Sequence, residues 1–208
     1  STTGLTVPVV GVRVRGRANF RRAGIGRHRE LIQKEVANRP FIIRCPWSAI
    51  GQSVVRKSFE HQPGDKEANL AKVRRFAAEA AGQGAELVVC PEMCVTGYWF
   101  LRDVSRAELA VLAEPVPDGP TTLELLGLAR EHGISVGAGF LERSDEGDLF
   151  NSYVVAMPDG SHVCHRKLHA FVNENVSSGS EFTVFDLPSG NRAAILICYD
   201  NILFENTR

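Results

Sequence analysis

The segment Ala193-Ala-Ile-Leu-Ile-Cys-Tyr-Asp200 is a short apolar run that ends at a cysteine. Small and β-branched residues before Cys198, with the turn residues Pro188-Ser-Gly-Asn191 upstream, predict a buried strand. Asp200 and Asn201 are typical of a helix cap, which predicts that Cys198 lies at a strand-to-helix turn. Backbone N–H groups and a helix N-terminus at such a turn favour the thiolate. The alternative is an ordinary core residue, because cysteines outside disulfides are often fully buried.

The composition is that of a soluble globular protein. The chain has 208 residues, of which 44% are hydrophobic and 23% are charged, enough for one domain with a sizeable core. No apolar run reaches the length of a bilayer span and no secretory signal pattern opens the sequence, so we expect no membrane association. The five cysteines lack the spacing of a disulfide framework, which favours a reducing, cytoplasmic compartment.

Charge divides the sequence near residue 50. Residues 1–50 hold ten of the 24 Lys and Arg residues but only two of the 24 Asp and Glu residues, so the remainder carries 14 basic and 22 acidic side chains. We therefore expect a basic N-terminal extension over 1–52, outside the folded core, and one domain over 53–208. The extension fits a targeting segment or a poorly ordered, non-essential arm. It lacks the aromatic interleaving of a nucleic-acid arm, so no nucleic-acid partner is expected.

From residue 53 onward, the apolar spacing predicts helices alternating with strands. Asp65 is a plausible N-cap of an amphipathic helix that ends near Gly82 or Gly84. A second helix starts at Pro120, has Leu123, Leu126 and Ala129 or Arg130 along one side, and stops at Gly133. Strands are expected over 86–90, 134–139, 150–157, 161–165, 182–187 and 192–198. This order predicts an α/β layer architecture.

Three chemically useful residues follow the ends of predicted strands: Glu92, Lys167 and Cys198. Strand ends in layered α/β folds converge on a cleft, which would bring these side chains together. They supply a base, a cation and a nucleophile, the set required for acyl transfer through a thioester. Each residue considered alone has an ordinary structural alternative. Glu92 has that of a solvated loop charge, Lys167 that of a surface lysine and Cys198 that of a core thiol.

Three sequence blocks resemble the signature blocks of the nitrilase (carbon–nitrogen hydrolase) superfamily. They are Pro91-Glu-Met-Cys-Val-Thr-Gly-Tyr98, His165-Arg-Lys-Leu-His169 and Ile197-Cys-Tyr-Asp200, in the family's order of Glu, Lys and Cys. The connecting phrases at 64–69, 139–142, 151–152 and 158–160 also match. The resemblance runs from about residue 53 to residue 208.

The resemblance implies a four-layer αββα sandwich, incomplete at the C-terminus because family domains continue beyond the cysteine turn. It implies a homo-oligomeric, cofactor-free hydrolase that cleaves a non-peptide C–N bond and releases ammonia. By position, Cys198 would be the nucleophile, Glu92 the general base and Lys167 the oxyanion partner. Glu142 matches a second acid that assists and orients in this family, the alternative being a strand-end charge.

The residues after the nucleophile bear on the substrate. Nitrile-cleaving members usually carry Trp-Glu after their cysteine, whereas this sequence has Tyr199-Asp200. The resemblance therefore favours small-molecule amides or carbamoyl compounds over nitriles.

Two other interpretations remain at this stage. The first is a metal site, because Cys90 and Cys94 and the group His162, Cys164, His165 and His169 are ligand types, although no four-ligand spacing emerges. The second is a catalytically inactive nitrilase-like fragment or scaffold that acts through protein–protein contacts. Arg56 and Lys57 in an expected core strand and the unusual Leu203-Phe-Glu205 ending favour that interpretation.

Overall fold

The computed structural model describes residues 10–15, 42–43 and 53–202. The sequence also predicts a short helix over 29–36, and this segment and the ending 203–205 lie outside these residues. Within them, no helix is both long enough and apolar enough to cross a bilayer.

Helices and strands alternate along the described chain. The helices are α1 (Lys66–Gly82), η1 (Trp99–Asp103), α2 (Arg106–Leu112), α3 (Pro120–His132) and η2 (Cys198–Asn201), of which η1 and η2 are 3-10 helices. The strands are β1 (Val10–Arg15), β2 (Ile42–Ile43), β3 (Ser53–Arg56), β4 (Ala85–Val89), β5 (Ser135–Arg143), β6 (Leu149–Ala156), β7 (His162–Arg166), β8 (Val176–Ser177), β9 (Thr183–Asp186) and β10 (Arg192–Ile197).

The described strands form a large and a small sheet. The large sheet has the order β2-β3-β4-β5-β6-β7, with β8 beside β6, and its central pairs β3–β4 and β4–β5 are parallel. The small sheet is antiparallel, with the order β1-β10-β9. β1 and β2 both come from the predicted extension 1–52, and β1 pairs with the whole length of β10. The division at residue 52 stays a prediction.

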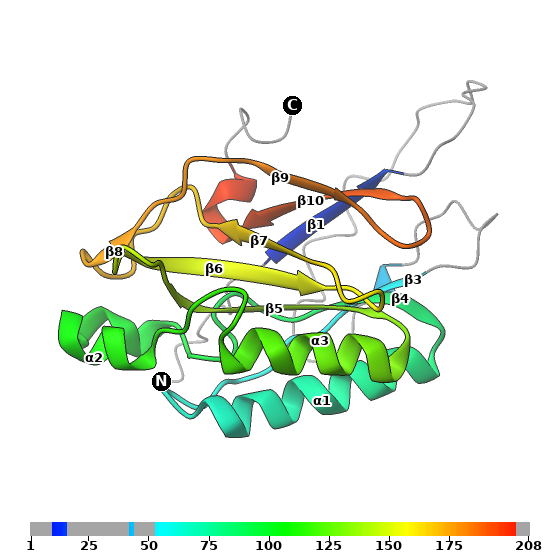
Figure 1. The fold of residues 1–208 in the computed structure, drawn as a ribbon, viewed down its shortest axis with the longest axis horizontal. Helices are drawn as coiled ribbons and strands as arrows, with labels where there is room; N and C mark the ends of the chain where they lie inside the picture. The colour runs from blue at the N-terminus through cyan, green and yellow to red at the C-terminus, as the bar shows by residue number, and fades with distance from the viewer. Residues whose placement is uncertain (1–9, 16–41, 44–52, 203–208) are drawn as a thin grey trace, which may run out of the picture.

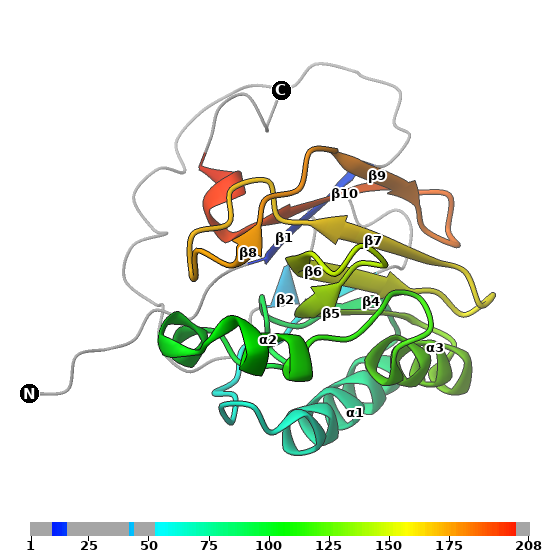
Figure 2. The same cartoon turned by 60° about the vertical axis from the view of Figure 1, so that its left-hand side comes forward.

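The helices cover one face of the large sheet and the small sheet covers the other (Figure 1). α1 and α3 lie side by side across the sheet in both orientations (Figures 1 and 2). The described residues thus build an α-β-β arrangement. One hydrophobic cluster lies under α1 and α3, and a second, containing Leu87, Tyr153, Phe185 and Ile195, fills the space between the sheets.

α1 confirms the predicted helix and its cap. The Asp65 carboxylate accepts a hydrogen bond from Ala68 N at 3.0 Å, which satisfies one of the unpaired N–H groups of the first turn. Gly84 has φ +70°, a left-handed conformation that glycine adopts easily after a helix end. The helix buries the predicted apolar face, namely Leu70, Val73, Phe76, Ala77 and Ala80.

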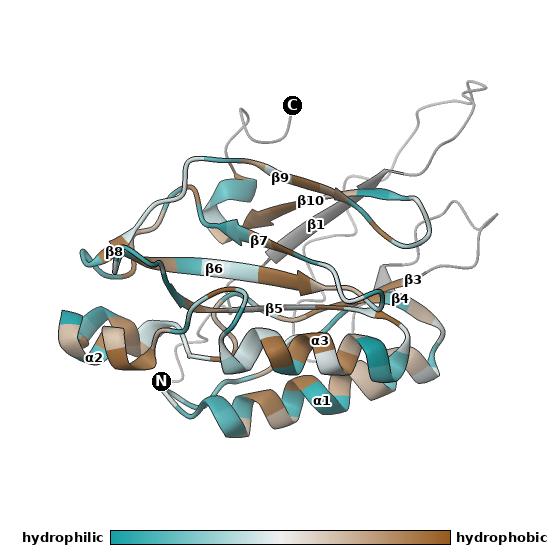
Figure 3. Cartoon of the chain, in the orientation of Figure 1, coloured by the Kyte–Doolittle hydropathy of each residue, from teal (hydrophilic) through white to brown (hydrophobic). Residues whose placement is uncertain are grey.

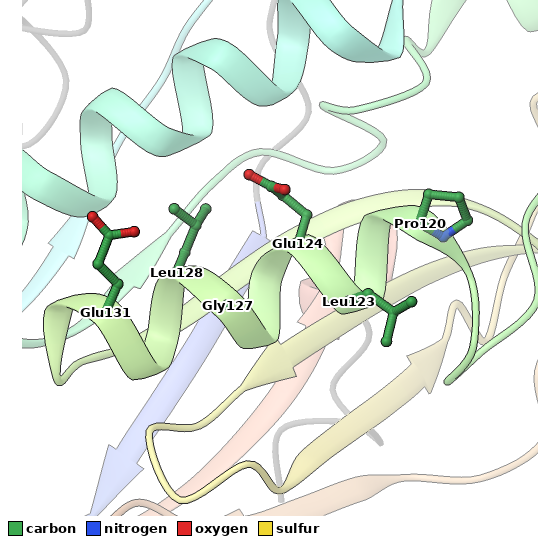
Figure 4. Close-up of a pocket in the computed structure, with 6 residues that line it drawn as sticks. All are labelled: Pro120, Leu123, Glu124, Gly127, Leu128 and Glu131. Carbon is green, nitrogen blue, oxygen red and sulfur yellow. The ribbon is translucent and has the colours of Figure 1, made fainter.

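α3 begins at Pro120 and is closed by Gly133 at φ +65°, as predicted, but its buried face is different. Leu125, Leu128 and Ala129 are buried, whereas Leu123 is 57% exposed. Two threonines at the start of the helix, Thr121 and Thr122, belong to the same buried face. A shallow hollow of about 360 Å³ runs along the outer side, lined by Pro120, Leu123, Glu124, Gly127, Leu128 and Glu131 (Figure 4).

Two basic residues, Arg56 at the end of β3 and Lys57 directly after it, fit into the fold without an unpaired buried charge at Lys57. Lys57 is buried, and its Nζ lies 2.7 Å from Glu79 of α1 and 5.1 Å from the ring centroid of Phe76. Arg56 is half-buried near Tyr153, and burial lowers the pKa of its guanidinium. An ion pair and a cation–π contact therefore make a charged residue compatible with this part of the core.

Candidate active site

The Glu92 segment is held against β5 immediately after β4 ends. Cys90 N donates to Gly137 O at 2.9 Å and Val95 N donates to Gly139 O at 3.1 Å, so backbone hydrogen bonds to β5 hold the segment both before and after Glu92. A Cβ added at Gly139 would lie 2.5 Å from Met93 N, closer than real contacts allow. The absence of a side chain at 139 therefore permits the approach that places Glu92.

Lys167 extends β7 and is fixed by its backbone. Its N–H donates to Asn151 O and its carbonyl accepts from Gly179 N, both at 2.8 Å. The Lys167 Nζ lies 2.7 Å from Glu92 Oε1, and both side chains have no exposed surface. Two of the three predicted catalytic residues, 75 positions apart in sequence, therefore form a buried ion pair.

Asn151 adds a second donor to the same carboxylate. Its Nδ2 donates to Glu92 Oε1 at 2.6 Å from β6. Hydrogen bonds to a charged acceptor are shorter and stronger than neutral ones. Because these two donors, one of them the ion-pair partner Lys167, replace water around Glu92 Oε1, the carboxylate is held in one orientation.

Cys198 starts η2 directly after β10, and its backbone is strained. It has φ +48°, the left-handed region that is uncommon for residues other than glycine. Its half-buried side chain packs against the cluster between the sheets. In Figure 3, β10 is hydrophobic and the short helix that follows it is hydrophilic, so the thiol lies where the core strand meets a polar turn. The predicted strand-end position of Cys198 matches this geometry.

Asp200 lies inside η2, and its carboxylate docks this short helix onto the segment after Lys167, whereas the residues of the predicted following helix lie outside the described part of the chain. Its buried carboxylate accepts from Leu168 N at 3.2 Å and His169 N at 3.1 Å, and it lies 2.9 Å from His169 Nδ1. An unpaired buried carboxylate is costly, so these bonds tie the Cys198 turn to the Lys167 segment.

Aromatic side chains line the junction of these two segments. Lys167 Nζ lies 4.7 Å from the ring centroid of Phe171 and 5.6 Å from that of Tyr98. The Phe171 ring lies 6.1 Å from Tyr199, the residue after Cys198. Burial raises the pKa of the Tyr98 hydroxyl, and the charges of Glu92 and Cys198 raise it further. Tyr98 is therefore within electrostatic reach of both the Glu92 carboxylate and the Cys198 thiol.

Glu142 lies in a separate cluster of contacts. It is buried and paired with Arg166, whose Nε lies 3.1 Å from both carboxylate oxygens, and it also accepts from Ser152 Oγ. Cys164 lies on its other side, where burial and then the charge of Glu142 raise the thiol pKa to about 12. Within the described chain these contacts link β5, β6 and β7, and the orienting role of Glu142 stays a prediction.

The sequence reasoning missed Asn151 and Tyr98 as members of this site. Asn151 carries a recognisable signal, because it and Ser152 are polar residues inside the otherwise largely apolar strand β6. Tyr98 carries none, because a tyrosine after a glycine is a common loop residue. The potential metal ligands are not gathered either: no group of three or more His, Cys, Asp or Glu side chains in the described ranges could hold a metal ion.

Sequence comparison assigns the chain to a known family. The carbon–nitrogen hydrolase family model matches residues 43–208, which is most of the chain. The chain therefore belongs to the carbon–nitrogen hydrolase family, as the three sequence blocks predicted.

Individual relatives agree with this assignment. A nitrilase of Pyrococcus abyssi is 36% identical over 148 residues, covering 69% of this chain and 54% of the relative. An (R)-stereoselective amidase of a Pseudomonas species is 36% identical over 147 residues, covering 70% and 50%. The chain spans about half the length of the curated relatives it matches.

Solved structures confirm the predicted α/β fold, and the matched part spans about half of each of those chains. The CN-hydrolase superfamily protein XC1258 of Xanthomonas campestris, with an arsenic adduct in its active site, superimposes with a TM-score of 0.54 at 25% identity. The match covers 64% of this chain and 48% of that one. A Nesterenkonia amidase variant in complex with butyramide shares the fold, with a TM-score of 0.51 at 21% identity, over 65% of this chain and 52% of the amidase.

Proposed function

We propose that this chain carries the cysteine site of a hydrolase that cleaves a non-peptide C–N bond in a small-molecule amide or carbamoyl compound. The observation that carries the proposal is the buried pair of Lys167 Nζ and Glu92 Oε1 at 2.7 Å, joined through Asp200 to the turn that presents Cys198. Family membership and the amidase and nitrilase relatives support the same reaction class.

In the proposed first half-reaction, the Cys198 sulfur attacks the carbonyl carbon while its proton passes to the Glu92 carboxylate. The C=O electron pair moves onto oxygen, where the Lys167 ammonium stabilises it with a proton not used by Glu92. Collapse of this intermediate breaks the C–N bond, and Glu92 returns the proton to the leaving nitrogen. The products are ammonia and a thioester on Cys198.

In the second half-reaction, water attacks the thioester carbon and gives a proton to Glu92. Collapse releases the carboxylic acid, and the proton from Glu92 restores the thiol. Each group thus begins the next cycle in its starting protonation state, and the chemistry requires no cofactor.

The decisive experiment measures ammonia released from butyramide and butyronitrile by the full chain. We expect release from the amide, faster than from the nitrile, and complete loss on Cys198→Ala with folding retained. Cys164→Ala is the matched control, because Cys164 is another half-buried thiol whose raised pKa makes it a poor nucleophile. Equal activity of the Cys198→Ala variant and the parent would contradict the proposal.

The second candidate is a non-catalytic, nitrilase-like scaffold that binds other proteins or copies of itself. Phe182 and Val184 favour it, because both are more than half exposed on or beside the edge strand β9. A folded chain that releases no ammonia and that self-associates in analytical ultracentrifugation would support this candidate over the hydrolase.

A further inference from the structure

Asn151 forms hydrogen bonds with both members of the buried ion pair, Glu92 and Lys167. It lies on β6, where every residue from 149 to 156 is buried. Its backbone carbonyl accepts from Lys167 N at 2.8 Å, and its side-chain Nδ2 donates to Glu92 Oε1 at 2.6 Å. One residue therefore fixes the backbone that carries the ammonium and the carboxylate that pairs with it.

The chemistry of the carboxylate dictates which end of the Asn151 amide faces it. An ionised carboxylate only accepts hydrogen bonds, so the NH₂ group must point at Glu92 and the amide oxygen must point away. The Lys167 Nζ donates to the same oxygen, Oε1. With two donors on Oε1, both lone-pair directions of that oxygen are occupied.

The other carboxylate oxygen has a contrasting environment. Glu92 Oε2 is fully buried, and in the described part of the chain it has no hydrogen-bond partner. A buried acceptor of this kind costs free energy unless a donor reaches it. Within this carboxylate, Oε2 is therefore the oxygen with lone pairs available for a proton.

We propose that Asn151 is a positioning residue that selects Glu92 Oε2 as the oxygen that accepts and returns the proton during hydrolysis. The inference rests on the function proposed above, because it assigns Glu92 the role of base. Asn151 acts through Glu92 and does not itself take the proton. A side chain that merely filled space in β6 would have no such effect on catalysis.

The test is Asn151→Leu, which has nearly the same size, keeps the carbonyl that holds Lys167 and lacks the donor. We expect kcat for butyramide to fall about 10- to 100-fold with KM unchanged, the loss expected for one hydrogen bond to a charged group. Asn151→Ser, too short to reach Glu92, is a second variant with the same expected loss.

Asn69→Leu is the matched control. Asn69 is equally buried and donates through Nδ2 to Gln62 O and Val95 O, with no contact to the ion pair. It should lower the temperature of unfolding without changing kcat below that temperature. An Asn69 variant with the same loss of kcat as Asn151→Leu would show that the effect is structural and would overturn the inference.

A double-mutant cycle separates this inference from the proposed function. The readout is the rate at which iodoacetamide alkylates Cys198, followed by mass spectrometry of the Cys198 peptide. Glu92→Gln and Asn151→Leu should each slow alkylation, and the double variant should be no slower than Glu92→Gln alone. Additive slowing would overturn the role of Asn151. Absence of ammonia release by the parent contradicts the proposed function, whereas the alkylation cycle decides the role of Asn151 in either case.

Discussion

At the scale of single residues, the site is dominated by a charge pair removed from water. The Lys167 and Glu92 side chains have no exposed surface, so neither can remain charged alone without a large desolvation cost. The pair thereby links β7 to the segment after β4. Stability and the proposed chemistry consequently depend on the same two side chains.

Lys167→Met should destabilise the protein and abolish hydrolysis together. Because the substitution leaves the Glu92 carboxylate buried without its cation, the free energy of unfolding should fall by about 3–5 kcal/mol. Urea unfolding followed by circular dichroism measures the change.

The double variant Glu92→Leu/Lys167→Met is the control for this effect. With both charges removed, most of the lost stability should return while hydrolysis stays absent. A double variant less stable than Lys167→Met would show that the pair does not behave as one buried unit.

At the scale of elements, close backbone approach positions the base. The segment after β4 lies so near β5 that position 139 cannot carry a side chain without displacing Met93 N. The glycine is therefore required by packing rather than by an unusual φ value.

Gly139→Ala should shift Glu92 and lower both stability and kcat. We expect a loss of about 1–3 kcal/mol, because a methyl group is forced into a filled space. Thermal unfolding and ammonia release measure the two effects.

Gly127→Ala is the opposite case and serves as its control. Gly127 is exposed in the middle of α3, with nothing within 4 Å of an added Cβ. Alanine there should stabilise the helix by about 0.5–1 kcal/mol and leave hydrolysis unchanged. A loss of stability at 127 as large as at 139 would contradict the packing argument.

Helices and strands with strong local signals can be predicted from the sequence. Features that depend on contacts between residues far apart in the chain cannot. α1 follows from its Asp65 cap and apolar spacing, whereas the buried face of α3 depends on how α3 meets the sheet. Asp200 is a residue type typical of a helix cap, and its position in the sequence gives no sign that its carboxylate also accepts hydrogen bonds from Leu168 N and His169 N, 32 and 31 residues away. The order of Glu92, Lys167 and Cys198 is visible in the sequence, but only the folded chain shows that Asn151 joins the first two.

At the scale of the whole molecule, the N-terminal part of the chain completes the small sheet. β1 pairs antiparallel with β10 along its full length, from Arg15 opposite Arg192 to Val10 opposite Ile197, the residue before Cys198. β1 therefore supports the strand that leads to the proposed nucleophile.

Deletion of residues 1–15 should destabilise the small sheet and disturb Cys198. Without β1, the edge of β10 has unpaired N–H and C=O groups, so we expect lower stability and increased aggregation. Size-exclusion chromatography and the alkylation rate of Cys198 measure these effects. Deletion of residues 1–9 alone leaves the pairing intact and is the matched control. Equal behaviour of the two deletions would contradict a supporting role for β1.

The ion pair between Lys167 and Glu92 has a consequence for how molecules reach the site. The positive and negative charges of the pair cancel at a distance, so the pair neither attracts nor repels ions strongly over a long range. Uncharged compounds would arrive by plain diffusion, and added sodium chloride should leave kcat/KM for butyramide nearly constant.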